Sequence, residues 1–220
     1  MIWGVIQFPG SCDERDALHA CSLTGEARLI WHEDRDLGGI DAVVVPGGFS
    51  YGDYLRAGAI ARFSPAMQAV AELAADGRPV LGICNGFQVL CECGLLPGAL
   101  LRNEDLRFSC RQVGLIAGGA DSPFTRTLAA GERISIPVKH GEGRFWAPED
   151  QLDRLEQASR VAFRYAPGDN PNGSARDIAG IVNEAGNVLG LMPHPEHAVD
   201  ALTGSTDGLR IFAGAATVAA

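Results

Sequence analysis

The sequence lacks the features that mark secreted, membrane-spanning and nucleic-acid-binding proteins. Its apolar start, residues 1–6, has no charged leader and no small-residue cleavage site, and it breaks at Pro9 too early to cross a membrane. The 18 lysines and arginines are outnumbered by 27 aspartates and glutamates, and they form no basic stripe that would follow a phosphate backbone. We therefore expect a cytoplasmic protein without a nucleic-acid or membrane partner.

Cysteines at metal-ligand spacing are also missing. The six cysteines include no C-x-x-C pair, and Cys91 and Cys93 would point in different directions on a helix. Disulfide frameworks are typical of short secreted chains, which this is not. We therefore expect no metal site, and we expect most of the thiols to be small buried hydrophobic groups.

No linker rich in serine, glycine or proline divides the chain, and no internal repeat or low-complexity run is found. Its 220 residues exceed the average domain length of about 150. With 46% hydrophobic residues, the chain can bury a sizeable core without disulfides or metals. We predict one domain over residues 1–220.

Short apolar runs alternate with helix-like stretches, and each run ends in turn residues. The clearest runs are 5–8, 42–45 and 79–83. Continuous apolar runs favour strands that are buried on both faces of a parallel sheet. Ser64 and Pro65 are a typical start for a helix over 65–74, and the alanine-rich residues 211–220 are expected to form a closing helix. This rhythm predicts an α/β domain with a mainly parallel central sheet.

The middle of the chain has a different pattern, in which strand-like pieces follow one another with little helix between some of them. These pieces are 112–116, 133–138 and 160–165. They predict a mixed or antiparallel extension of the same sheet.

Residues 80–90 place a cysteine where a strand changes into a helix. Gly82, Cys84 and Gly86 form the pattern G-x-C-x-G, the cysteine version of a nucleophile elbow. Side chains two residues before and after the nucleophile would collide in so sharp a turn, and glycine removes that collision. The helix N-terminus also favours the reactive thiolate. The alternative is a buried structural cysteine whose glycines merely allow close packing.

Five histidines are candidates for the catalytic base. We expect His19 on a surface helix and His32 on a charged surface, whereas His140 lies in the Gly-rich segment 139–143, a loop expected near a functional region. His194 stands out because prolines on both sides hold it in a rigid, non-helical loop.

Glu196 lies two residues after His194 and can accept the imidazole Nδ1–H, which leaves Nε2 to face the thiol. Cys84, His194 and Glu196 are therefore the predicted catalytic triad. The alternative for this segment is a surface loop stiffened by prolines.

Gly47 and Gly48 directly follow a predicted strand. A backbone N–H here and that of Asn85 would form an oxyanion hole. In a parallel sheet such strand ends meet at one edge, where ligands bind. A pair of glycines alone is weak support, since turns use it everywhere.

Three segments, in this order, resemble the signatures of the class I glutamine amidotransferases. They are residues 46–48, 82–88 and 193–196. Further segments resemble the glutaminase subunits of phosphoribosylformylglycinamidine synthases: 47–61, 94–98, 140–143, 177–183 and 187–193. The resemblance extends from Val5 to about Phe212.

This resemblance implies a flavodoxin-like three-layer sandwich and a glutaminase that passes ammonia to a larger synthetase subunit in purine biosynthesis. The synthetase would use ATP and magnesium, this chain would carry no cofactor, and a small accessory subunit often completes such complexes. Gln88, His140, Gly141 and Glu142 would help to hold glutamine. The length of the chain and its start at Met1 lead us to expect a separate subunit.

Two positions depart from the pattern of this family. Ser11 precedes Cys12 where the family usually has asparagine, and His197 stands where it usually has arginine. We expect neither to touch the triad. The alternatives that stay open are a stand-alone cysteine hydrolase or thiol-based chaperone, a non-catalytic interaction subunit, and a class I amidotransferase subunit that serves another acceptor.

Overall fold

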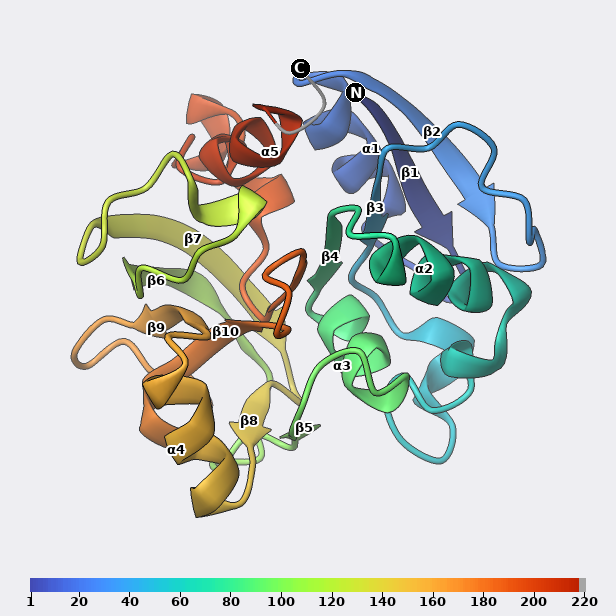
Figure 1. Ribbon diagram of the computed structural model, residues 1–220. Helices are drawn as coiled ribbons and strands as arrows, with labels where there is room; N and C mark the ends of the chain where they lie inside the picture. Colours follow the sequence, from blue (N-terminus) through green and yellow to red (C-terminus); the bar gives the residue numbers. More distant parts are fainter. Residues whose placement is uncertain (218–220) are drawn as a thin grey trace.

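The computed structural model describes residues 1–217, which form a mixed nine-stranded sheet with helices on both faces (Figure 1). The sheet has the order β2-β1-β3-β4-β11-β10-β9-β6-β7. Its strands are β1 (Ile2–Gln7), β2 (Glu26–Trp31), β3 (Ala42–Val45), β4 (Val80–Ile83), β6 (Ser109–Ala117), β7 (Arg133–His140), β9 (Val161–Tyr165), β10 (Ile178–Val182) and β11 (Val188–Leu191). A separate ribbon pairs β5 (Ala99–Leu101) with β8 (Arg144–Trp146).

The sheet has a parallel half and an antiparallel half. Strands β2, β1, β3, β4 and β11 are parallel, and β10, β9, β6 and β7 continue the sheet with antiparallel pairs. A row of fully buried side chains crosses four of the parallel strands in register: Val5, Val44, Leu81 and Leu189. Burying each such side chain contributes about 1.5–3 kcal/mol. The predicted α/β class, with its parallel core and antiparallel extension, is confirmed.

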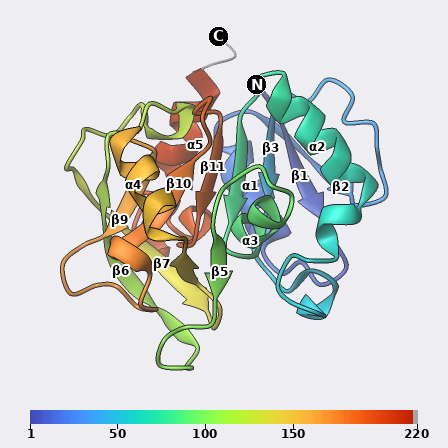
Figure 2. The same cartoon turned by 60° about the horizontal axis from the view of Figure 1, so that its bottom comes forward.

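Helices cover the two faces because the connections run in opposite directions. They are α1 (Glu14–Ser22), α2 (Pro65–Ala75), α3 (Asn85–Glu92), α4 (Glu149–Gln157) and α5 (Leu209–Ala216). The chain steps outward from β1 to β2 but the other way from β3 to β4, so right-handed crossovers place α1 and α2 on opposite faces. In Figure 2, α2 lies over the parallel half and α4 over the antiparallel half.

The helix predictions are confirmed at α2, where the Ser64 hydroxyl accepts a hydrogen bond from Met67 N at 3.3 Å and caps the helix. The closing helix is present as α5, while residues 218–220 of that prediction lie outside the described part of the chain. Among residues 1–217, no helix has the length and apolar content needed to span a bilayer.

In the middle region, helix α4 separates β8 from β9; it buries only two leucines and holds its charged face outward. Two expectations about the rest of the chain are wrong. His32 is buried rather than solvated, because its Nδ1 lies 2.6 Å from the hydroxyl of Tyr51. Most thiols are not buried either: Cys12 and Cys110 are exposed, and two others are half-buried.

Candidate active site

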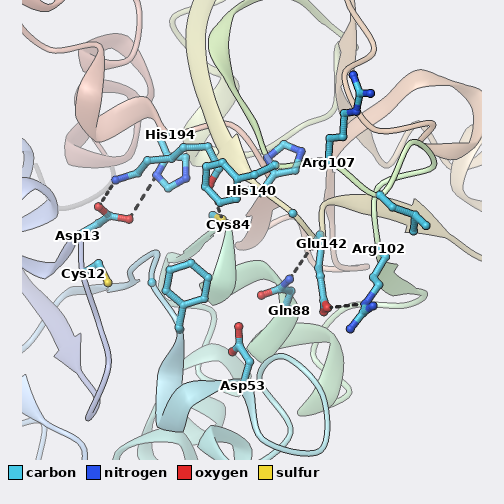
Figure 3. A pocket seen from close by; sticks show the side chains of 16 residues that line it. Cys12, Asp13, Asp53, Cys84, Gln88, Arg102, Arg107, His140, Glu142 and His194 are labelled. Atoms are coloured by element: carbon cyan, nitrogen blue, oxygen red, sulfur yellow. Dashed lines mark hydrogen bonds and ion pairs between the residues drawn. The ribbon is translucent and has the colours of Figure 1, made fainter.

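The site lies at the carboxyl edge of the parallel strands. β1, β3, β4 and β11 are neighbours, so the segments that follow them meet at one edge. The chain departs in opposite directions from β1 and β3, which makes this edge the switch point where α/β sheets bind ligands. A pocket of about 470 Å³ opens there (Figure 3). Its lining includes Gly48, Asp53, Cys84, Gln88, His140 and His194.

Cys84 occupies a strained turn between β4 and α3. Its backbone has φ +50° and ψ −104°, a conformation that residues other than glycine rarely adopt. A Cβ on Gly82 would lie 2.7 Å from the carbonyl oxygen of Gly86, and a Cβ on Gly86 would lie 1.9 Å from that of Val45. Only glycine fits at these two positions, so the turn has the geometry of a nucleophile elbow and places the sulfur at the start of α3.

His194 is fully buried and lies beside Cys84 (Figure 3). Two contacts from outside the pocket hold its ring and its backbone. Its Nδ1 lies 2.6 Å from Glu196 Oε1, and its backbone N–H donates to the carbonyl of Pro137 in β7 at 2.8 Å. Burial favours the neutral ring, but the negative charges of Glu196 and of a Cys84 thiolate outweigh it and raise the pKa of His194 to about 10. The three predicted triad residues are thus brought together.

Two backbone N–H groups are available where an oxyanion would form. On either side of Gly48, Cys12 N donates to the carbonyl of Gly47 at 3.2 Å and Phe49 N donates to the carbonyl of Gly10 at 2.9 Å. Neither of these bonds uses the N–H of Gly48. Gly48 has φ +140°, which favours glycine. Asn85 is the first residue of α3, and its N–H therefore has no partner within the helix.

The residues predicted to hold the substrate line the same pocket. Gln88 Nε2 donates to the carbonyl of Glu142 at 2.6 Å, and Gln88 Oε1 accepts from Asn85 Nδ2 at 2.8 Å. Gly141 lies between His140 and Glu142 in the pocket wall. Of the residues predicted to hold the substrate or the oxyanion, only Gly47 and Asn85 are absent from the lining, and both are buried.

His140 lies at the end of β7 rather than in the expected loop, and it is held neutral. Its Nε2 accepts from the side-chain amide of Asn172 at 2.9 Å. Burial, and after it the charge of His194, lowers the pKa of His140 to about 3. Because Nε2 of this neutral ring accepts, Nδ1 carries the proton and is a buried donor without a hydrogen-bond partner among the described residues.

We expect His140 to make the fold sensitive to mild acid. Between its native pKa of about 3 and the unfolded value of about 6.5, the unfolded state binds more protons, so the free energy of unfolding falls as the pH drops, by up to about 1.4 kcal/mol per pH unit. His140→Gln keeps an oxygen that can accept from Asn172 but cannot titrate. Urea unfolding at neutral pH and at about pH 5 should show the larger loss in the wild type.

The raised pKa of Asp53 acts in the opposite direction over this range, but it is common to both proteins and cancels in the comparison. Equal losses on acidification would show that His140 titrates normally in the native state.

Asp13 is the site residue that the sequence did not indicate. This buried carboxylate follows β1, binds the Lys139 ammonium directly, and lies 3.6 Å from His194 Nδ1 and 3.4 Å from His197 Nε2. Burial opposes its ionisation, but the close approach of His197 and the charges of His194 and Lys139 hold the pKa of Asp13 well below its usual range. Residue 47 must be glycine, since a Cβ added at this position would lie 2.4 Å from Asp13 Oδ2.

The expectation that His197 does not touch the triad is wrong. Its ring centroid lies 5.4 Å from that of His194, and its Nε2 lies 3.6 Å from Glu196 Oε1. Ser11, the other departure, accepts a hydrogen bond from Phe8 N at 3.0 Å and makes none to the triad among the hydrogen bonds of residues 1–217. The donor atoms of Asp13, His194, Glu196 and His197 lie within 4.8 Å of one another, a spacing that could hold a metal, but the Lys139 ammonium already supplies positive charge there.

Comparison with known proteins places this geometry in a family. The family described as CobB/CobQ-like glutamine amidotransferase domain matches residues 4–211. The "Phosphoribosylformylglycinamidine synthase subunit PurQ" of Salinibacter ruber is 58% identical over 96% of this chain and 93% of its own length. The Thermus thermophilus protein of the same name is 55% identical, with 97% of each chain covered.

Among solved structures, a chain of "Structure of PurLQS from Thermotoga maritima" superimposes with a TM-score of 0.91 at 42% identity, covering 100% of this chain and 99% of that one. A putative GMP synthase subunit from Thermoplasma acidophilum shares the fold at 15% identity, with a TM-score of 0.66 over 100% of this chain and 96% of that one. The resemblance predicted from the sequence is confirmed, and the chain belongs to the CobB/CobQ-like glutamine amidotransferase family.

Proposed function

We propose that this chain is the glutaminase subunit of a phosphoribosylformylglycinamidine synthase. It hydrolyses glutamine through Cys84, His194 and Glu196 and passes the ammonia to an ATP-dependent synthetase subunit in purine biosynthesis. The observation that carries the proposal is the strained Cys84 elbow beside the buried His194–Glu196 pair. Its presence in a chain 58% identical to a PurQ subunit points to the acceptor.

The first half of the reaction forms a thioester. The Cys84 thiolate attacks the side-chain amide carbon of glutamine, and the N–H groups of Gly48 and Asn85 stabilise the oxyanion. The His194 imidazolium then gives its proton to the departing nitrogen, so that ammonia leaves and a glutamyl thioester remains. A raised pKa suits His194 to this step, because it keeps the ring protonated beside a thiolate.

The second half hydrolyses the thioester. Neutral His194 takes a proton from water as the water attacks the same carbon, and the collapse of the intermediate releases glutamate and restores the thiolate. Glu196 accepts the Nδ1–H throughout, so Nε2 faces the reacting atoms, and its charge stabilises the imidazolium. Gln88, His140, Gly141 and Glu142 surround the rest of the substrate, and Gly47 allows the close packing of Asp13 and His194.

The mouth of the pocket supports docking of the synthetase on this face. Three exposed apolar side chains line it, Phe49, Leu106 and Phe108, and two more, Tyr54 and Leu55, follow the pocket residue Asp53 in the sequence. Exposed apolar groups gathered around a site mark an interaction surface. A partner seated there would receive ammonia without its passage through bulk water. ATP and magnesium belong to that partner in this proposal, which also includes a small accessory subunit and assigns no cofactor to this chain.

The test is product formation from formylglycinamide ribonucleotide, ATP and glutamine with the synthetase subunit present. We expect glutamine turnover to be slow in the free subunit and fast in the complex. A free subunit as fast as the complex would favour a stand-alone cysteine hydrolase. Fast glutamine turnover without product would favour another acceptor.

Leu55→Asp is expected to weaken the complex by about 10-fold or more, because it places a charge in an apolar interface. Leu55 is 89% exposed with φ +71°, a conformation that aspartate tolerates better, so the free subunit should stay folded. Leu202→Asp is the matched control, since Leu202 is 94% exposed and its segment, Ala201–Thr203, contributes no residue to the pocket lining. The measurement is the Kd for the synthetase subunit; equal effects of the two variants would place the interface elsewhere.

A further inference from the structure

We propose that Asp53 binds the α-ammonium group of glutamine and thereby selects an α-amino acid amide over other primary amides. The inference rests on the proposed function and assigns one more residue to the recognition of its substrate.

Asp53 is the unpaired carboxylate of the pocket. Of the other acidic side chains at the site, Asp13 is bound by Lys139, Glu142 by Arg102 at 3.2 Å, and Glu196 by His194. Within residues 1–217, no lysine, arginine or histidine nitrogen lies within 4.0 Å of the Asp53 carboxylate.

The Asp53 side chain is half-buried and points into the pocket, below Gln88 (Figure 3). Taking a carboxylate out of water without a counter-ion is unfavourable, and burial accordingly raises the pKa of Asp53 to about 6. A cationic group of the ligand would offset this cost. Glutamine offers one such group, its α-ammonium, four bonds from the amide carbon that Cys84 attacks.

Asp53 is also held firmly with respect to the nucleophile. Asn85, the residue after Cys84, donates from Nδ2 to Asp53 Oδ1 at 3.1 Å and accepts from Ser50 N at 3.1 Å. The other carboxylate oxygen, Oδ2, makes no hydrogen bond to a side chain of the described residues; besides Asn85, the neutral backbone N–H of Gly58 also stabilises this carboxylate.

The backbone that carries Asp53 is strained. Tyr51, Asp53 and Leu55 have positive φ angles of +54°, +53° and +71°. Such conformations are unfavourable outside glycine and are typical of functional sites. The hydrogen bonds of Asn85 therefore hold the Asp53 carboxylate in place on a strained segment.

The experiment compares Asp53→Asn with the wild type in the complex, using L-glutamine and 4-carbamoylbutanoate, which has the same amide and carboxylate but no α-amino group. Because a hydrogen bond to a charged group is lost, kcat/KM for L-glutamine is expected to fall by about 10- to 100-fold, mainly through KM. For the deaminated substrate it should change little, since that molecule never reaches Asp53 with a cation. Asparagine keeps an oxygen that can accept from Asn85.

Three results would overturn the inference. Equal losses for both substrates would mean that Asp53 merely supports Asn85. Unchanged kinetics with a weaker complex would mean that Asp53 pairs with a cation of the synthetase. A slower reaction of Cys84 with iodoacetamide, which has no α-ammonium, would mean that the substitution displaces the elbow.

Asp76→Asn is the matched control, because it removes the same charge from an exposed position at the end of α2. It should leave kcat/KM unchanged for both L-glutamine and 4-carbamoylbutanoate. Failure of the proposed function is distinguishable, because the wild-type complex would then not hydrolyse L-glutamine at all.

Discussion

Cys84→Ala is expected to abolish glutamine-dependent product formation while product formation from added ammonium stays intact. The other thiol in the pocket lining, Cys12, is not on a strand-to-helix turn, and burial and the charge of Asp13 raise its pKa, so it cannot readily replace Cys84. Removal of a triad nucleophile costs about 10⁶-fold in kcat in a comparable hydrolase. Alanine keeps the Cβ that Cys84 already has at φ +50°, so the substitution adds no backbone strain to the elbow.

The measurement is the rate of product formation by the complex with glutamine and, separately, with ammonium. Cys110→Ala serves as the matched control, because Cys110 is an exposed thiol that does not line the pocket. Glutamine turnover that survives in Cys84→Ala would end the assignment of this thiol as the nucleophile. Loss of both activities would instead show that the variant no longer supports the complex.

The parallel half of the fold is readily predicted from the sequence because its strands are buried on both faces. Val43, Val44 and Val45 have no exposed surface, and a continuous apolar run is the direct consequence. Strand β2 was missed for the opposite reason: it is the edge strand, buries Ile30 alone, and therefore mixes charged with apolar residues. Helix α4 is hard to predict from the sequence for a similar reason, since only Leu152 and Leu155 face the core.

The Cys84 elbow and the contact between His194 and Glu196 were predictable because each depends on residues close together in the sequence. Gly82, Cys84 and Gly86 are constrained by contacts within one turn and with the adjacent strand, so their spacing is visible in the sequence. His194 and Glu196 are two residues apart, and their 2.6 Å contact needs no long-range information. The roles of these residues, and the division of the chain into one domain, stay predictions.

Asp13 could not be predicted because its position resembles an ordinary helix start. It precedes α1, where aspartate is a common N-cap, but its side chain makes no capping hydrogen bond. The carboxylate turns instead to Lys139, which lies 126 residues away in the sequence, and to His194 and His197. Only the folding of β1, β7 and the segment after β11 onto one edge brings these charges together.

Glu196→Gln is expected to lower kcat by about 10²- to 10⁴-fold, because an amide carries no charge to stabilise the imidazolium and can present an N–H to the ring. The negative charge of Glu196 helps to raise the pKa of His194 to about 10, so its loss should lower that pKa. The imidazolium is present only below this pKa, and the alkaline limb of the rate profile should therefore move to lower pH. An unmoved limb would contradict the pairing; Glu184→Gln, on an exposed side chain, is the control.

Asp13 should limit that loss, since its Oδ2 lies 3.6 Å from the same Nδ1 and can partly replace the missing charge. Asp13→Asn is therefore expected to cost more kcat in the Glu196→Gln background than in the wild type, because there Asp13 is the remaining anion beside the ring. A double-mutant cycle on kcat measures this coupling. Additive losses would mean that Asp13 serves only to hold Lys139, whereas a larger loss in the double variant would establish two carboxylates behind one catalytic histidine.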